Sequence, residues 1–141
     1  MHLEPSREYT HENDAFSDEL ARLGRLGGEN PSVISTGGGC LALSAGAGAD
    51  DSGRAMYLLA TTNGEPALYR EHIEYWSVGL YWTGGDTVPL GMGEASVDAY
   101  GVSGDALETA MVRATTAWLV GANSAGHVAR IDDAGVHFDA Y

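Results

Sequence analysis

A chain of 141 residues is the size of one ordinary domain, and its apolar content of 44% is typical of a folded globular protein. It carries 20 acidic residues against 7 basic ones, all of them arginine, for a net charge of −13. That charge argues against direct binding to nucleic acid or to anionic membranes, both of which need basic patches. No apolar stretch is long enough to span a bilayer and no signal-peptide pattern is present, so we expect a cytoplasmic protein.

The N-terminal segment combines a polar arm with one amphipathic helix. Residues 1–12 are polar and have no periodicity, so we predict a flexible arm there. Three apolar residues then recur at the spacing of one helix face: Phe16, Leu20 and Leu23. The pair Gly27-Gly28 stops this pattern, which predicts a helix over 13–27.

The middle of the chain has patterns typical of β structure. Short apolar or alternating segments bounded by turn residues predict five strands: 32–36, 40–45, 54–62, 72–82 and 87–90. The segment 46–53 is small, acidic and rich in glycine, so we predict a loop there. The strand over 72–82 carries bulky side chains on both faces, which indicates a position in the middle of a sheet.

The C-terminal part contains the clearest helix signal, followed by a hairpin. Apolar residues at helical spacing predict a helix over 104–120. Residues 127–140 are predicted to form a hairpin in which Ile131 lies opposite Val136. Together the elements predict an α+β fold, a single domain over 13–141 with an antiparallel sheet of about five to seven strands and two helices on one face.

A thiol-based active site is the alternative functional interpretation of this chain. Cys40 could act as a nucleophile, with His72 as its base and Asp86 as the orienting carboxylate. A reactive thiol needs a lowered pKa, from a nearby cation or a helix N-terminus, whereas Cys40 opens a predicted strand. We therefore assign no catalytic residue, and a small enzyme or ligand-binding domain centred on these three residues stays the alternative.

The sequence predicts no metal and no cofactor. His72-x-Glu74 and His137-x-Asp139 each place two ligand-type side chains on one strand face, but this spacing is unspecific for a metal. The glycine-rich segments have neither the lysine of a phosphate loop nor a complete dinucleotide fingerprint. Trp76 and Trp82 share one face of a predicted strand, where they either belong to the core or form a binding platform for sugars.

The acidic residues carry the main functional hypothesis. Folding could gather some of them into a negative surface that attracts a basic partner protein. The residues predicted to bind are Asp50, Asp51, Glu65, Glu71, Glu74, Asp132 and Asp133. Such a non-enzymatic protein would imitate nucleic acid and inhibit a basic host protein that handles it. Adaptation of a housekeeping domain to high salt, or a GC-rich genome, would explain the same acidity, and the sequence leaves the oligomeric state open.

The segment Ser35-Thr36-Gly37-Gly38-Gly39-Cys40-Leu41-Ala42-Leu43 resembles part of some small uncharacterised proteins of actinobacteria and their phages. Those proteins have a similar Thr-Gly-Gly-Gly-Cys step into a strand, followed by a hairpin. The resemblance covers a minor part of the chain and brings no assigned catalytic residues. It implies a phage or mobile-element setting, in which small acidic proteins often inhibit host defence proteins.

Overall fold

The computed structural model describes residues 14–37, 40–63, 68, 73–84, 88–121 and 126–140. Its elements in chain order are α3 (Ser17–Arg25), β1 (Glu29–Gly37), β2 (Cys40–Ala49), β3 (Ala55–Thr62), β4 (Tyr75–Trp82), β5 (Gly91–Ser96), α4 (Val97–Tyr100), α5 (Ser103–Gly121), β6 (His127–Asp132) and β7 (Gly135–Ala140). They form a single α+β domain, which confirms the predicted fold class. Within these ranges, no helix has the length and apolar content that crossing a membrane requires.

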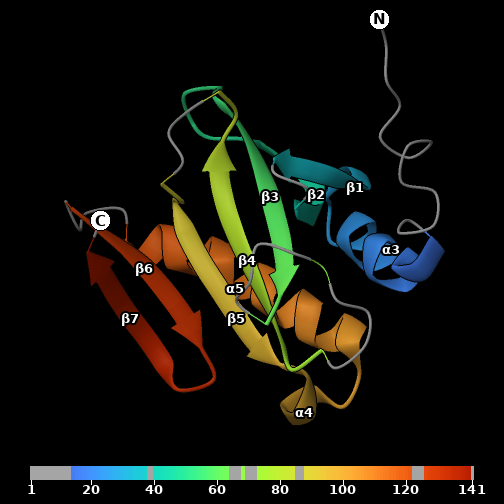
Figure 1. The fold of residues 1–141 in the computed structure, drawn as a ribbon. Coiled ribbons are helices and arrows are strands. Elements are labelled where there is room, and N and C mark those ends of the chain that lie inside the picture. Colours follow the sequence, from blue (N-terminus) through green and yellow to red (C-terminus); the bar gives the residue numbers. More distant parts are fainter. Residues whose placement is uncertain are drawn as a thin grey trace, which may run out of the picture.

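The seven strands form one sheet in which the spatial order follows the chain order, with β1 and β7 at the two edges (Figure 1). Neighbouring strands are antiparallel except β5 and β6, which are parallel. Parallel neighbours need a crossover connection, and α5 supplies it. The predicted long strand corresponds to β4, which lies fourth in the sheet and has neighbours on both sides.

One face of the sheet packs against the helices. Alternate residues of β4 point to this face and are buried: Trp76, Val78 and Leu80. The main helix α5 lies closest to β5, because Gly91 and Gly93 leave no side chain between the two backbones. Its sheet-facing side carries small residues such as Ala110 and Ala114, both fully buried. The predicted range 104–120 differs from α5 by one residue at each end.

The N-terminal helix α3 lies on the same face, next to β1 and the start of α5 (Figure 1). Its apolar side contributes Phe16 and Leu23 to the core, with the Phe16 ring edge-on to Trp76 at a centroid distance of 6.0 Å. Trp76 is therefore a core residue, and its Nε1–H donates to the Ser103 hydroxyl at 2.8 Å, which itself donates to Glu19 at 2.9 Å. This buried chain of hydrogen bonds joins β4, α5 and α3.

Arginine side chains on α3 complete its contact with α5. Arg22 is bound to Asp105 and lies 3.7 Å from Glu108, and Arg25 is also bound to Glu108. These ion pairs join α3 to the first turns of α5. They stabilise the packing of the two helices against each other on one face of the sheet.

Several predicted boundaries differ from the structure. The segment 46–53 was predicted as a loop, but β2 continues to Ala49 because β3 pairs with it, with a register shift after Gly46. Residues 87–90 were predicted as a strand, but 88–90 are irregular and β5 begins at Gly91. The short helix α4 was not predicted. In β2 and β5, small residues without a strong apolar alternation form a strand because they pair with neighbouring strands. This is a tertiary effect, which local sequence patterns do not show.

Candidate acidic binding site

An acidic cavity of about 530 Å³ lies where the ends of β4, β5 and β6 meet α4. Five carboxylate side chains line it: Glu74, Glu94, Asp98, Asp132 and Asp133. The parallel pairing of β6 with β5, which places Ile131 opposite Gly93, brings the β6–β7 turn beside the start of α4. Residues about forty positions apart in the chain therefore share one site, which we call the acidic cavity.

The backbone of Glu74 is held in place before β4 begins. Its N–H donates to the side-chain oxygen of Asn63 at 2.7 Å, and its carbonyl accepts from the N–H of Val97 at 2.9 Å. Asn63 occupies a left-handed turn position with φ of 57°, a conformation that asparagine tolerates better than most residues. The turn after β3 and the start of α4 therefore position Glu74 at the rim of the acidic cavity.

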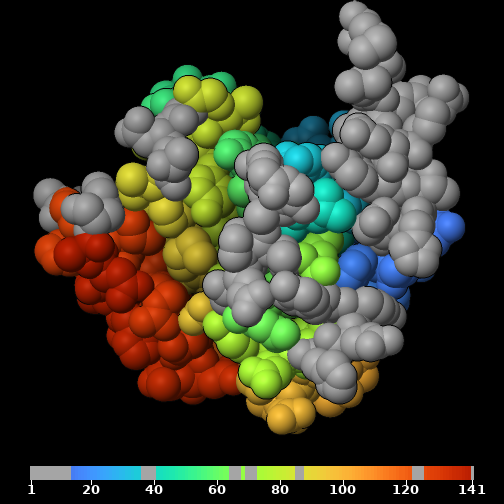
Figure 2. All heavy atoms as spheres, viewed as in Figure 1, coloured from blue at the N-terminus to red at the C-terminus, as the bar shows by residue number. Residues whose placement is uncertain are grey.

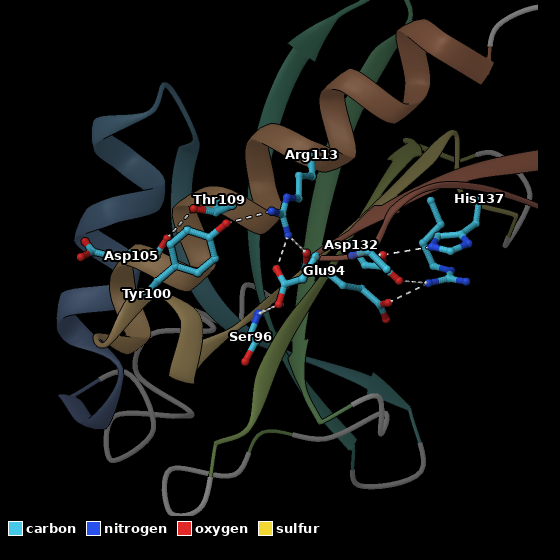
Figure 3. Close-up of polar contacts among 11 residues, drawn as sticks. Glu94, Ser96, Tyr100, Asp105, Thr109, Arg113, Asp132 and His137 are labelled. Atoms are coloured by element: carbon cyan, nitrogen blue, oxygen red, sulfur yellow. Dashed lines mark hydrogen bonds and ion pairs between the residues drawn. The ribbon is translucent and has the colours of Figure 1, made fainter.

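Arg113 joins α5 to the wall of the acidic cavity (Figure 3). Its Nη1 donates to the backbone carbonyl of Glu94 and to Oδ1 of Asp133, both at 2.6 Å, and its Nη2 donates to the Tyr100 hydroxyl at 2.8 Å. The other oxygen of Asp133 accepts from the Ser96 N–H at 3.2 Å. This guanidinium group thus fastens the β6–β7 turn to the junction of β5 and α4.

Arg130, on β6, holds a second group of carboxylates. Its Nη1 donates to Asp132 at 2.7 Å and to Glu94 at 3.1 Å, and its Nε donates to Asp139 at 2.8 Å. The hydrogen bond to Asp139, followed by the negative charges around the guanidinium, raises the pKa of Arg130 further above its usual value. Arg130 therefore stays charged at any ordinary pH and binds three carboxylates at once.

Asp132 is held in its ionised form. Partial burial by itself raises the pKa of this carboxyl group, but hydrogen bonds from His137 and from the Ala134 N–H outweigh it, so that the pKa of Asp132 lies below its usual value. Oδ1 of Asp132 lies 3.0 Å from Nε2 of His137.

The acidic cavity keeps an excess of negative charge. Its five carboxylates face two guanidinium groups, and the exposed side chains of Glu74 and Asp98 form no ion pair within the described part of the chain. The phenol of Tyr75 in the cavity wall responds to this environment, because burial first, and then the charges of Glu94 and Glu74, raise its pKa. The site can therefore attract cations or a basic surface.

The structure brings together three of the seven residues predicted to bind: Glu74, Asp132 and Asp133. Asp50 and Asp51 lie elsewhere, in the turn between β2 and β3. Glu65 and Glu71 lie outside the described residues.

Asp50 organises its own turn. Its carboxylate accepts from the N–H and hydroxyl of Ser52, at 2.9 and 2.6 Å, and from the N–H of Arg54 at 2.9 Å. It also accepts from Nε1 of Trp82 at 3.0 Å, and the Arg54 guanidinium lies 4.1 Å above the Trp82 ring. The Ser52 hydroxyl and then the Arg54 N–H lower the pKa of Asp50. Trp82, the last residue of β4, is half-buried and packs against the core.

The structure offers no test of the predicted thiol site. Cys40 begins β2, opposite Gly37, and both His72 and Asp86 lie outside the described residues. His137 and Asp139 share one face of β7, as predicted, but each is bound to a neighbour on β6. Among the described side chains, no group of three or more histidine, cysteine, aspartate or glutamate residues is arranged to hold a metal ion.

Sequence reasoning missed Glu94, Asp98 and Arg113 as parts of the site. The signal for Glu94 was the alternation of small and larger residues over 91–96, which is typical of a strand that packs closely on one side. Nothing local indicates that Arg113 reaches the β6–β7 turn, because that contact depends on how α5 lies across the sheet.

No family model, curated protein or solved structure matches this chain. The resemblance to actinobacterial and phage proteins therefore stays a prediction. The fold and the site define the chain as an α+β domain with a helix-covered sheet and an acidic cavity at the end of its central strands.

Proposed function

We propose that this protein is a non-enzymatic interaction protein that binds a basic surface of a partner through its acidic cavity. The observation that carries the proposal is the convergence of five carboxylates on one cavity, from the segment just before β4, from β5, α4 and β6, and from the β6–β7 turn. A concave site with one sign of charge focuses the electrostatic field, which speeds encounter with a partner of the opposite sign.

The arrangement of the arginines supports this proposal. Arg22, Arg25, Arg113 and Arg130 are each paired with carboxylates of the protein itself. Their positive charges stabilise the fold and are not presented together to a partner. Among the described residues, the acidic cavity therefore presents to a partner the carboxylates of Glu74 and Asp98, which form no ion pair there.

The partner we propose is a basic host protein that handles nucleic acid, and the acidic surface would imitate its natural ligand and inhibit it. Proteins that bind nucleic acid place lysine and arginine against its phosphates, so their binding surfaces carry the positive potential that an acidic cavity attracts. A cytoplasmic location, and a phage or mobile-element origin with a role against host defence, belong to the same proposal. The thiol enzyme gains no support, since two of its three residues lie outside the described part of the chain.

A pull-down from host lysate tests the proposal, with the tagged protein washed in parallel at low and high salt and the bound proteins identified by mass spectrometry. We expect one dominant basic partner that is lost at high salt and displaced by added double-stranded DNA. The double variant Glu74→Gln/Asp98→Asn removes two charges from the rim of the acidic cavity and should lose this partner.

The matched control is Asp14→Asn/Glu29→Gln, which removes the same charge from exposed positions away from the acidic cavity. It should retain the partner. Equal loss with both double variants would contradict a localised site, and a partner that resists high salt and DNA would contradict imitation of nucleic acid.

A further inference from the structure

The two edges of the sheet differ in how well they are protected against pairing with another strand. β1 contains Pro31, and its pairing with β2 shows two register shifts. Such irregularities are the usual protection of an edge. β7, in contrast, pairs with β6 through six consecutive residue pairs without a shift, and it contains neither proline nor lysine. β7 is therefore a regular edge that is able to accept a further strand.

The helix-side face of β7 is apolar and exposed. Val136 and Phe138 lie opposite Ile131 and Ala129 of β6, and Ala129 faces Gly121 of α5. Both side chains therefore point to the side of the sheet that carries α5, yet they remain 49% and 50% exposed. Figure 2 shows β6 and β7 (red) along one flank of the molecule, with β7 at its margin.

The opposite face of β7 carries one basic-type and one acidic side chain. His137 and Asp139 point away from α5, on the same side as Arg130. His137 uses Nε2 toward Asp132, which leaves Nδ1, and Asp139 uses one carboxylate oxygen toward Arg130, which leaves the other. Each side chain thus has one polar atom to offer to a neighbouring strand.

We propose that β7 pairs antiparallel with β7 of a second copy, so that two sheets join into one in a two-fold symmetric dimer. A two-fold axis perpendicular to the sheet keeps both α5 helices on one side. Each residue then lies opposite one whose side chain points to the same face. The register must therefore be centred on one residue of β7.

The register centred on Phe138 is complementary to itself. Phe138 lies opposite Phe138 of the second copy, Val136 lies opposite Ala140, and His137 lies opposite Asp139, in both directions. Cross-strand aromatic pairs stabilise a sheet, and an imidazole nitrogen can form a hydrogen bond with a carboxylate on the neighbouring strand. The neighbouring register, centred on His137, would oppose His137 to itself and Asp139 to Gly135. The matching of Phe138 with itself and of His137 with Asp139 therefore selects a second copy of this chain in the register centred on Phe138.

Cysteine crosslinking tests this register in a Cys40→Ser background, which removes the natural thiol. Opposed Cβ atoms in an antiparallel sheet are close enough for a disulfide. Phe138→Cys should therefore form a covalent dimer in a glutathione redox buffer. We expect it to form about tenfold faster than with Leu119→Cys, because pairing raises the effective thiol concentration. Leu119 is a matched control, because it is also a large apolar side chain and is 67% exposed, but it lies on α5 and not on β7.

The other positions of β7 distinguish the registers. Val136→Cys and Ala140→Cys should each crosslink as slowly as Leu119→Cys, whereas the double variant Val136→Cys/Ala140→Cys should crosslink rapidly. Fast crosslinking at residue 137 but not at residue 138 would overturn the register. A Phe138→Cys rate equal to that of Leu119→Cys would overturn the dimer.

Sedimentation velocity on the natural chain gives an independent measurement. We expect a dimer that is lost in Phe138→Lys and kept in Leu119→Lys, with the circular dichroism spectra of both variants unchanged. Two copies of charge −13 repel each other, so the dimer should become stronger as salt rises. A complex with a basic partner should become weaker as salt rises. The opposite salt dependence of the dimer and of that complex therefore tests the two proposals independently. A natural chain that stays monomeric at high concentration and high salt would overturn the dimer.

Discussion

At the scale of single residues, several polar side chains of this protein hold its own turns and strand ends in place. Asp50 closes the turn between β2 and β3, Asn63 positions Glu74, and Arg113 fastens the β6–β7 turn to β5. A hypothesis drawn from acidic residues alone cannot separate these roles from binding. The place of each carboxylate in the fold makes the distinction, because Asp50 lies in a turn away from the acidic cavity whereas Glu74 and Asp98 line it.

Asp50 provides a test with a defined pH dependence. The pKa of Asp50 in the folded protein lies below that of the unfolded chain, which is about 3.9. Its contribution to stability is therefore present above the unfolded pKa and is lost as the pH falls through the folded pKa. We expect Asp50→Asn to melt at a lower temperature than the natural chain at pH 7, with the difference disappearing toward pH 3.

The measurement is thermal unfolding followed by circular dichroism across this pH range. The matched control is Asp51→Asn, which changes the adjacent, exposed carboxylate and should leave the melting temperature unchanged at every pH. A difference for Asp50→Asn that stays constant down to pH 3 would show that the charge of Asp50 has no part in stability.

At the scale of elements, the close approach of α5 to β5 determines where the acidic cavity forms. The parallel pairing of β5 and β6 requires α5 to cross the sheet, and Gly93 allows it to cross close by. Arg113 then reaches the β6–β7 turn from α5. The wall of the acidic cavity thus depends on packing between a helix and a glycine-rich strand.

Gly93→Ala tests this packing. A Cβ atom at Gly93 would overlap backbone atoms of Ala110 and Ala114, so α5 would have to move. We expect a loss of about 1–3 kcal/mol in the free energy of unfolding, the usual cost of overpacking, measured by urea denaturation.

The control for this variant is Gly24→Ala in α3, where the new Cβ would meet only Cγ of Pro31 at 3.6 Å, an ordinary contact. Because alanine is a better helix former than glycine, Gly24→Ala should be neutral or stabilising by up to about 1 kcal/mol. Equal effects of the two substitutions would contradict a special constraint at Gly93.

At the scale of the whole molecule, a net charge of −13 acts against the compact state through self-repulsion. We expect cooperative melting in dilute buffer, because the hydrophobic core is continuous. Ion pairs within the molecule also join α3 to α5, and β6 to its neighbours. Salt should then raise the melting temperature by about 5 °C, as repulsion is screened. Differential scanning calorimetry from low to high NaCl measures this.

The same titration separates two explanations of the acidity. A chain that is unfolded in dilute buffer and folds only at high salt would favour adaptation to a saline environment. It would also weaken the proposal that the acidic surface exists for a partner.

Much of the fold could be predicted because its signals are local. The pattern of Leu107, Met111 and Ala114 repeats at helical spacing, and all three residues are buried in α5. The register of the C-terminal hairpin, with Ile131 opposite Val136, follows from a four-residue turn between alternating segments and is confirmed. The extent of β2 and the start of β5 could not be predicted, since glycine and alanine carry no strong preference and pairing decides.

The sequence by itself determined the fold class, the central position of the strand around Trp76 and the excess of negative charge. Each of these follows from periodicity or composition, which are properties of neighbouring residues. Only the tertiary structure decided which carboxylates meet. Glu74 and Asp98 come together because β4 pairs with β5, and Asp133 joins them because β6 pairs parallel to β5 after the crossover through α5. Contacts between residues far apart in the chain depend on strand order and helix packing. Local sequence patterns predict neither of these.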